Sequence, residues 1–281
     1  MKTIYKTSEF LELRDKLSQN IALIPTMGSI HEGHISLIET AKKYAKIVVV
    51  TIFVNPIQFN SKDDYNSYPN TLEKDKEILI KNEIDILFCP LNSEIYPNDF
   101  NTYVHVNRFI KTLEGKYRNG HMEGVATIVT KLFNITRPEY AIFGEKDFQQ
   151  LLLIKAFVRD LNMPVKIISS KTIRDKDGLA LSSRNEKLSL EEKISSVEII
   201  KSLKMAFQKI TSGEKSSQKI IDLINVYLSK FELIKVEYVS IRHPQTFETI
   251  NKIKEECVIL IAVFVGNVRL IDNIIYDEKN G

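Results

Sequence analysis

Residues 21–54 read IALIPTMGSIHEGHISLIETAKKYAKIVVVTIFV and contain one complete strand–helix–strand unit. The apolar residues 21–24 predict a short strand, which the turn-forming sequence PTMG at 25–28 ends. Residues 34–46 predict a helix. Residues 47–54 are β-branched and apolar on both faces, which is typical of a strand buried in a parallel sheet. The stretch therefore predicts the first unit of an α/β protein.

The same alternation continues to about residue 174. Apolar spacing predicts further helices at 8–19 (with Ser8 as the N-cap), 71–82, 124–135 and 147–161. Apolar runs predict further strands at 84–88, 140–143 and 165–169. This order predicts a Rossmann-like, doubly wound parallel sheet, in which ligands bind beyond the carboxyl ends of the strands.

The pattern changes after the loop at 174–184. Residues 190–231 look helical, with a break near 211–213, and three strand-like runs follow at 236–241, 258–265 and 268–271. This is an α+β pattern. We therefore expect two domains, residues 1–175 and a smaller C-terminal domain of residues 176–281.

Composition excludes several classes of protein. The chain has 281 residues, 43% hydrophobic and 27% charged, with a formal net charge of +3. That is ordinary globular composition and argues against a nucleic-acid coat protein. Cys89 and Cys257 lie in apolar runs, so neither a disulfide framework nor a zinc site is expected. The N-terminus lacks a signal-peptide pattern and no apolar run approaches the roughly 20 residues of a membrane span, so we expect a cytoplasmic protein.

The sequence PTMGSIHEGH, residues 25–34, carries the first chemical signal. A turn between a strand and a helix points backbone N–H groups and the helix dipole towards an anion. His31 and His34, three residues apart, share one side of the first helical turn and can donate hydrogen bonds to a phosphate. A purely structural turn remains an alternative. Zinc binding is disfavoured because the H-E-x-x-H spacing and a cysteine partner are missing.

Five blocks in order resemble the pantothenate synthetase (pantoate–β-alanine ligase) family of the H-x-G-H nucleotidyltransferase superfamily. They are PTMGSIHEGHISLI at 25–38, FVNPIQFN at 53–60, FGEKDFQQL at 143–151, DGLALSSRN at 177–185 and RLIDN at 269–273. The resemblance implies condensation of pantoate with β-alanine through pantoyl adenylate. The reaction would use ATP and Mg²⁺ and release pyrophosphate and AMP. It also implies a homodimer, with no nucleic-acid or membrane partner.

The resemblance further implies roles for particular residues. His34, His31 and Lys146 would be catalytic, Gln58 and Gln150 would bind substrate, and Asp75 would help to bind Mg²⁺. The residues expected to bind ATP are Met27, Gly28, Ser29, Ile30, His31, Glu32, Gly33, His34, Gly144, Glu145, Lys146, Asp147, Ile173, Leu181, Ser182, Ser183 and Arg184.

Some positions depart from the family pattern and leave alternatives open. Met122 replaces an aromatic residue and the preceding loop looks shortened, so direct roles for Arg118 and His121 stay open. Asn70 stands where the family usually has an arginine. Asp75 is equally consistent with a solvated helix carboxylate. Two other functions stay possible: another adenylyl-transferring enzyme of the superfamily, and a regulatory nucleotide-binding protein. The Gln58 and Gln150 pair disfavours the first, and the presence of His34 and Lys146 disfavours the second.

Overall fold

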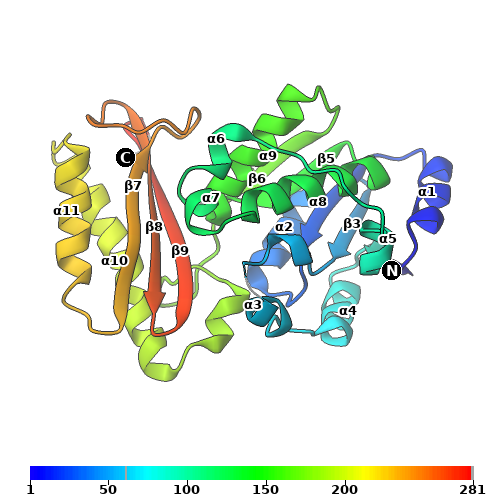
Figure 1. Cartoon of the computed structure of the whole chain (residues 1–281), viewed down its shortest axis with the longest axis horizontal. Coiled ribbons are helices and arrows are strands. Elements are labelled where there is room, and N and C mark those ends of the chain that lie inside the picture. The colour runs from blue at the N-terminus through cyan, green and yellow to red at the C-terminus, as the bar shows by residue number, and fades with distance from the viewer. Residues whose placement is uncertain (61, 280–281) are drawn as a thin grey trace. The chain divides into compact units, whose positions relative to one another are not determined.

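The computed structural model describes residues 1–60 and 62–279 (Figure 1). The chain forms two compact units, Met1–Lys171 and a second that begins at Thr172. The sequence placed the division after residue 175. Each unit has its own sheet and its own core.

The first unit is built on one six-stranded sheet in which every neighbouring pair is parallel. Its strand order is β1-β4-β3-β2-β5-β6, which confirms the predicted doubly wound sheet. All five predicted strands are present, and β1 is additional. The strands are β1 (Lys2–Ile4), β2 (Ile21–Thr26), β3 (Ile47–Ile52), β4 (Ile86–Phe88), β5 (Tyr140–Gly144) and β6 (Lys166–Ser170).

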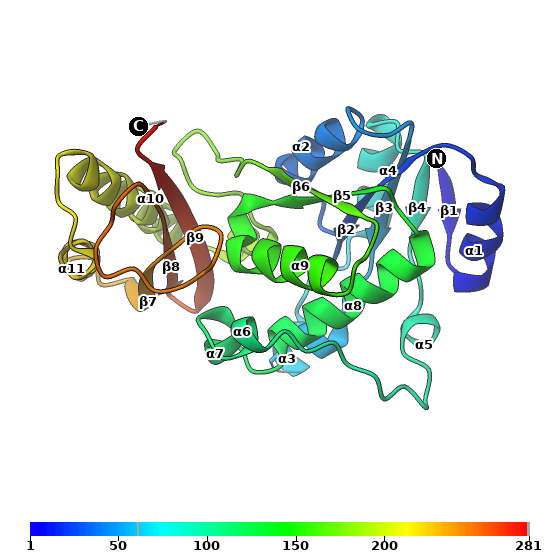
Figure 2. The ribbon, with the colours of Figure 1, turned by 90° about the horizontal axis from the view of Figure 1, so that it is seen from above.

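Helices cover both faces of this sheet. In Figure 2, α2 and α4 lie on one face and α8 and α9 on the other. The longer helices are α1 (Thr7–Lys16), α2 (Glu32–Ala41), α4 (Leu72–Lys81), α8 (His121–Thr136) and α9 (Phe148–Asp160). The sequence did not predict the short helices η1 (Pro56–Gln58), α3 (Lys62–Asn66), α5 (Asn92–Ile95), α6 (Asn107–Ile110), α7 (Glu114–Tyr117) and η2 (Glu145–Asp147).

Three predicted helix starts are wrong. α8 begins at His121, three residues before the predicted residue 124. The N-cap of α1 is Lys6 rather than Ser8. The N-cap of α2 is His31, so the helix begins two residues before the predicted residue 34. An imidazole is not among the preferred capping side chains, which explains why the sequence did not reveal this start.

Pro25 marks the place where β2 and β5 part. Alternate residues of a parallel strand turn their N–H and C=O groups to opposite neighbours. The carbonyl of Ile21 accepts from Glu139 on the β5 side, and Pro25, which has no N–H, faces that same side. Pairing between β2 and β5 ends at Leu23, opposite Ala141, so no hydrogen bond is lost at Pro25.

The chain order reverses at the same two strands. From β2 the sheet grows through β3 and β4 in one direction, and from β5 through β6 in the other. Ligands of open α/β sheets bind beyond the carboxyl ends of the strands at such a switch point. The topology therefore predicts a ligand site where β2 and β5 end.

The second unit is a three-stranded antiparallel sheet with two helices. Its core contains Leu203, Ile224, Ile259 and Val263. The last strand runs well beyond the predicted residue 271, because it pairs with its neighbour up to Asp277. The elements are η3 (Ser183–Lys187), α10 (Leu190–Thr211), α11 (Ser217–Leu228), β7 (Ile234–Arg242), β8 (Glu256–Val265) and β9 (Val268–Asp277).

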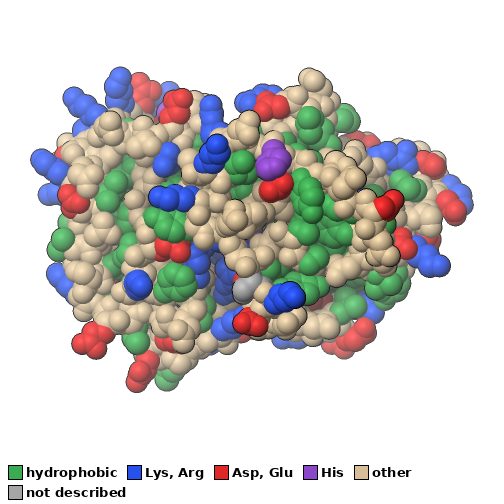
Figure 3. Space-filling view, viewed as in Figure 1, with side chains coloured by type: hydrophobic (Ala, Val, Ile, Leu, Met, Phe, Trp, Pro, Cys, Tyr) green, Lys and Arg blue, Asp and Glu red, His purple; other side chains and the backbone are tan. Residues whose placement is uncertain are grey.

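Two surface properties can be compared with the sequence. Among the described residues, none of the helices has the length and apolar character that crossing a membrane requires. Basic and acidic side chains are interspersed on the face seen in Figure 3, in keeping with the small net charge.

Candidate active site

The turn between β2 and α2 has an unusual backbone. Gly28 and Ser29 both have positive φ, 83° and 54°. The amides of Ser29 and Ile30 donate to the carboxylate of Asp75 at 2.9 and 2.8 Å, and the Gly28 amide donates to Thr26 Oγ1 at 3.2 Å. The expectation that the N–H groups of this turn face a bound anion is therefore wrong for these three residues. Their donors are satisfied within the chain.

Asp75 comes from α4 and is 1% exposed. Besides the two amides, its carboxylate accepts from Thr71 Oγ1 at 3.0 Å. A Cβ added at Gly28 would lie 3.0 Å from Asp75 Oδ2, so glycine allows the close approach as well as the positive φ. The structure thus gives Asp75 a definite task, which is to hold the turn that leads into α2.

His31 and His34 cap the start of α2 through their rings. The Gly33 amide donates to His31 Nδ1 at 3.1 Å, and the His31 amide donates to His34 Nδ1 at 3.3 Å. Each Nδ1 accepts, so we assign the proton of each neutral ring to Nε2. The ring centroids are 4.2 Å apart. The capping arrangement therefore fixes two adjacent imidazoles as Nε2–H donors.

Lys146 lies in η2, directly after β5, and its side chain is 18% exposed. Its ammonium is 3.5 Å from Asp147 Oδ1. The pKa of His34 is lowered to about 3, first by burial and then by electrostatic interaction with His31 and Lys146. His34 is therefore neutral at physiological pH. The three predicted catalytic residues meet at the carboxyl ends of β2 and β5.

Gln58 is buried in η1 and its side-chain amide is bound on both sides. Asn55 Nδ2 donates to Gln58 Oε1 at 2.9 Å, and Gln58 Nε2 donates to Met27 Sδ at 3.2 Å. Asn55 in turn accepts from the Tyr96 hydroxyl at 2.8 Å. Sequence reasoning did not identify Asn55. A signal was present, since this amide side chain stands directly before Pro56 at the end of an apolar run.

His121 holds the backbone of Gln58 in place. Its Nδ1 lies 2.8 Å from the Gln58 carbonyl, and its Nε2 lies 2.8 Å from Arg118 Nη1. A carbonyl only accepts and a guanidinium only donates, so His121 carries its proton on Nδ1. Arg118 also pairs with Glu114 at 3.6 Å. These contacts define what Arg118 and His121 do in the structure, which the sequence had left open.

Gly124 lets η1 approach the backbone of α8. A Cβ at this position would lie 2.7 Å from the Ile57 carbonyl oxygen and 2.9 Å from the Gln58 nitrogen. No side chain fits there without moving the backbone. The position of Gln58 therefore depends on the absence of a side chain at Gly124 as well as on hydrogen bonds.

The neighbouring residues Gln149 and Gln150 have different surroundings. Gln149 is 3% exposed and binds three backbone groups, the Glu114 amide and the carbonyls of Phe109 and Thr112. Gln150 is half-buried, and its side chain makes no hydrogen bond to the described residues. Gln149 is thus a structural residue. The amide of Gln150 is available to a ligand.

Five of the predicted ATP residues belong to the second unit: Ile173, Leu181, Ser182, Ser183 and Arg184. The Ile173 carbonyl accepts from the Leu181 amide at 3.0 Å. Ser182 is the N-cap of η3, and its hydroxyl accepts from the Arg184 amide at 3.3 Å. Ser182, Ser183 and Arg184 are all partly exposed. This unit therefore presents its predicted phosphate-binding side chains on an ordered turn.

The side chains near Asp75 decide whether the predicted Mg²⁺ contact is chemically reasonable. Among the described residues, no three His, Cys, Asp or Glu side chains are grouped to hold a metal. Mg²⁺ is commonly bound through one or two carboxylates together with substrate phosphates and water. Asp75 Oδ1 accepts a single hydrogen bond, so it retains a lone pair. The described residues offer a substrate-borne Mg²⁺ one carboxylate contact and do not form a metal cage of their own.

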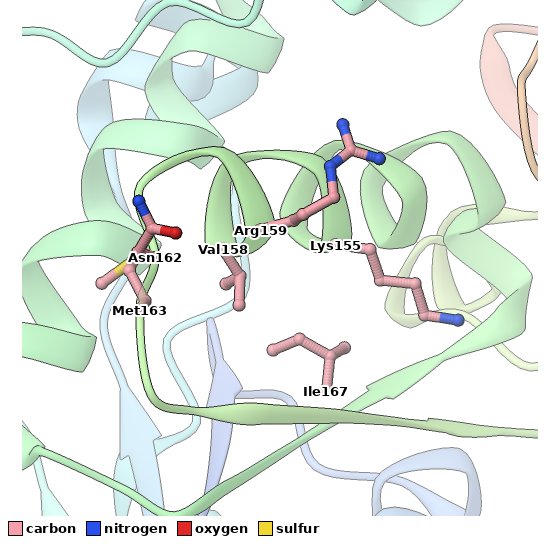
Figure 4. Close-up of a pocket in the computed structure, with 6 residues that line it drawn as sticks. All are labelled: Lys155, Val158, Arg159, Asn162, Met163 and Ile167. Carbon is pink, nitrogen blue, oxygen red and sulfur yellow. The ribbon is translucent and has the colours of Figure 1, made fainter.

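A groove of about 490 Å³ lies elsewhere, between α9 and β6. In Figure 4, Val158 and Ile167 face each other across it, and the guanidinium of Arg159 points away from them. None of the predicted site residues lines this groove. The remaining lining residues are Lys155, Asn162 and Met163.

The site can now be compared with known proteins. The sequence profile of the family described as "Pantoate-beta-alanine ligase" matches residues 1–275. This chain belongs to that family. The pantothenate synthetase of Thermoanaerobacter sp. (strain X514) is 47% identical over 265 residues, 94% of each chain. That of Clostridium botulinum (strain 657 / Type Ba4) is 47% identical over 254 residues, 90% of each chain.

Solved structures agree with this assignment. The pantothenate synthetase of Thermus thermophilus matches with a TM-score of 0.93 and 36% identity, covering 98% of this chain and 99% of that one. The pantoate–β-alanine ligase of Francisella tularensis, complexed with "Beta-gamma ATP and Beta-alanine", matches with a TM-score of 0.80 and 36% identity, covering 100% and 99%. The resemblance drawn from the sequence is confirmed, and the chain is an enzyme of the ligase class that joins pantoate to β-alanine.

The low pKa of His34 predicts a pH dependence. The folded-state pKa of about 3 lies below the usual 6.5, so the fold favours the neutral ring. That stabilisation is complete above about pH 6.5 and is lost as the pH falls towards 3. NMR of the imidazoles should show no titration of His34 between pH 8 and pH 5. In denaturant unfolding, the free energy of unfolding should fall less for His34→Gln than for the unsubstituted protein when the pH is lowered from 6.5 to 4.

The exposed His105 provides the control, since His105→Gln removes an imidazole outside the site. Its unfolding free energy should follow that of the unsubstituted protein over the same pH range. A His34 resonance that titrates near pH 6.5 would contradict the burial argument.

Proposed function

We propose that this enzyme joins its substrates through an acyl adenylate. The pantoate carboxylate attacks the α-phosphorus of ATP, forming pantoyl adenylate and releasing pyrophosphate. The β-alanine amine then attacks the acyl carbon, which forms pantothenate and releases AMP. The observation that carries the proposal is the meeting of two Nε2–H imidazoles with the Lys146 ammonium at the ends of β2 and β5.

The first step needs stabilisation of charge more than covalent help. Negative charge on the phosphate oxygens is redistributed as the α-phosphorus accepts the carboxylate and pyrophosphate leaves. In this proposal, His34 and His31 donate hydrogen bonds through Nε2, and Lys146 supplies a full positive charge. The acyl adenylate is already activated, so no protein nucleophile is required in either step.

Gln150 and Gln58 bind the organic substrates in this proposal. The amide of Gln150 has capacity for a ligand, and its two donors and its acceptor match the hydroxyl and carboxylate groups of pantoate. Gln58 is held by Asn55, Met27 and His121, so it offers a fixed polar surface to pantoate and β-alanine. Preorganisation of this kind reduces the entropy that binding costs.

ATP binding is proposed for residues of each unit. In the first unit they belong to the turn from Met27 to His34 and to Gly144, Glu145, Lys146 and Asp147. In the second unit they are Ile173, Leu181, Ser182, Ser183 and Arg184. When bound, Mg²⁺ would neutralise phosphate charge, with Asp75 as its contact in the chain. A homodimer and a cytoplasmic location complete the proposal.

The proposed pathway is tested by the order in which products appear. Pyrophosphate should form from ATP when pantoate is added, and AMP should follow only after β-alanine is added. Both can be measured by quenched-flow separation of labelled ATP products. Pyrophosphate formation at the same rate without pantoate would contradict the acyl-adenylate route, and so would AMP release that precedes β-alanine.

Removal of the charge stabilisers should slow the first step. His34→Ala and Lys146→Ala should each reduce pantoate-dependent pyrophosphate release by about 10²–10³-fold, the scale for one lost transition-state donor. Lys155→Ala is a matched control, since this lysine is exposed in α9 and lines only the separate groove. A rate for either site variant within about twofold of the control would exclude that residue from the mechanism.

The two neighbouring glutamines should have separable effects. Gln150→Ala should raise the KM for pantoate about tenfold or more, because a hydrogen bond to a charged group is lost, and should leave the melting temperature unchanged. Gln149→Ala should instead lower the melting temperature, because three buried backbone groups lose their partner. An unchanged KM for pantoate in Gln150→Ala would remove Gln150 from the substrate site.

A further inference from the structure

Residues 173–181 form a small hairpin at the start of the second unit. The Leu181 amide donates to the Ile173 carbonyl at 3.0 Å, and Arg174 pairs with Ala180 in an antiparallel bridge. Asp175 Oδ1 closes the tip, accepting from the amides of Asp177 and Leu179, both at 2.9 Å. We call this segment the 173–181 hairpin.

The Arg174 guanidinium fastens this hairpin to β9. Nη1 donates to Asp272 Oδ2 at 2.7 Å and to the Gly178 carbonyl at 3.2 Å. Nη2 donates to Asp272 Oδ1 at 2.9 Å and to the Asn273 carbonyl at 3.3 Å. All four N–H groups of the two terminal nitrogens are therefore used. A lysine in the same place could not reproduce this bidentate geometry.

Asp272 lies inside β9, and its side chain is 3% exposed. Apart from Arg174, it accepts only from the Asn273 amide, at 2.7 Å, among the described residues. A buried carboxylate is costly unless it is paired. The arginine on the hairpin and the carboxylate on the strand therefore depend on each other.

The hairpin also carries the segment that follows it. Asn185 Nδ2 donates to the Ala180 carbonyl at 3.0 Å, and the Asn185 amide donates to the Ser182 carbonyl at 2.9 Å. The turn with Ser182, Ser183 and Arg184 is thereby tied to the hairpin. A continuous set of bonds runs from β9 through Asp272 and Arg174 to these side chains.

We propose that the Arg174–Asp272 pair positions the ATP-contacting residues of the second unit. It fixes the hairpin on β9, so that the Ile173 backbone and the side chains of Ser182, Ser183 and Arg184 keep one arrangement. Arg174 and Asp272 are positioning residues and need not touch ATP. The inference rests on the proposed function, because only that proposal assigns ATP contacts to these residues.

The pair should therefore affect ATP much more than pantoate. Arg174→Lys and Asp272→Asn should each raise the KM for ATP about tenfold or more, while the KM for pantoate stays within about twofold. Arg269→Lys is a matched control: Arg269 also lies on β9 and pairs with Glu237 at 2.6 Å, with both side chains largely buried. It should leave the KM for ATP unchanged.

A double variant separates positioning from stability. Arg174→Met with Asp272→Leu replaces the pair by apolar side chains of similar volume, a change that often preserves the stability of a fold. Its melting temperature should stay close to that of the unsubstituted protein, whereas its KM for ATP should remain raised. Limited proteolysis should show faster cleavage within 173–185 in this variant than in Arg269→Lys.

Several outcomes would overturn the inference. One is a normal KM for ATP in both single variants. Another is a normal KM for ATP in the double variant. A third is a KM for ATP that rises as much in Arg269→Lys as in Arg174→Lys and Asp272→Asn. If the unsubstituted protein itself fails to release pyrophosphate in response to pantoate, the proposed function fails first. That result is distinguishable because it requires no variant.

Discussion

The carboxylate of Asp75 holds the turn on which the rest of the site depends. It accepts from the amides of Ser29 and Ile30, in a turn where Gly28 and Ser29 both have left-handed backbone. For serine this conformation costs about 1–2 kcal/mol. A hydrogen bond to a charged group contributes about 1.5–3 kcal/mol, so two such bonds outweigh the strain. Because Asp75 belongs to α4, the packing of that helix also sets where α2 begins.

Because the Ser29 and Ile30 amides already donate to Asp75, side chains rather than these amides are left to contact a ligand. His31 and His34 use each Nδ1 for the first turn of α2, which leaves the proton of each ring on Nε2. Gln58 is fixed in a similar way, by Asn55 on its side chain and by His121 on its carbonyl. These functional groups are thus held by hydrogen bonds within the chain, to backbone amides for the two histidines and to the Asn55 and His121 side chains for Gln58.

The sequence predicted much of the fold because the decisive strands are strongly apolar and separated by helical patterns. It did not predict β1, since three residues carry too little pattern and this strand is defined by its pairing with β4. It also ended β9 too early, because Asp272 and Asn273 interrupt the apolar run. Only the fold shows that the buried Asp272 is paired with Arg174, 98 positions earlier in the chain. Long-range partners of this kind have no local signature.

The same limit explains what was found and missed in the candidate site. The motif containing His31 and His34 was found because both residues lie in one turn. The binding of its amides by Asp75, 45 and 46 positions further along, was not foreseen, and neither was the part played by Asn55. Sequence reasoning located the residues expected to meet a ligand. It could not assign the residues that hold them.

Because His34 is neutral, the histidines and Lys146 contribute differently to the proposed reaction. A full charge acts over a long range and stabilises bound triphosphate and transition state to a similar degree, which improves binding more than rate. A neutral N–H donor is directional and short-ranged, so its contribution depends on where charge develops. Burial of His34 close to Lys146 keeps its ring neutral and leaves the long-range charge to the lysine. In the proposed mechanism, the site thus combines the Lys146 cation with neutral donors whose contribution depends on the geometry of the reacting phosphate.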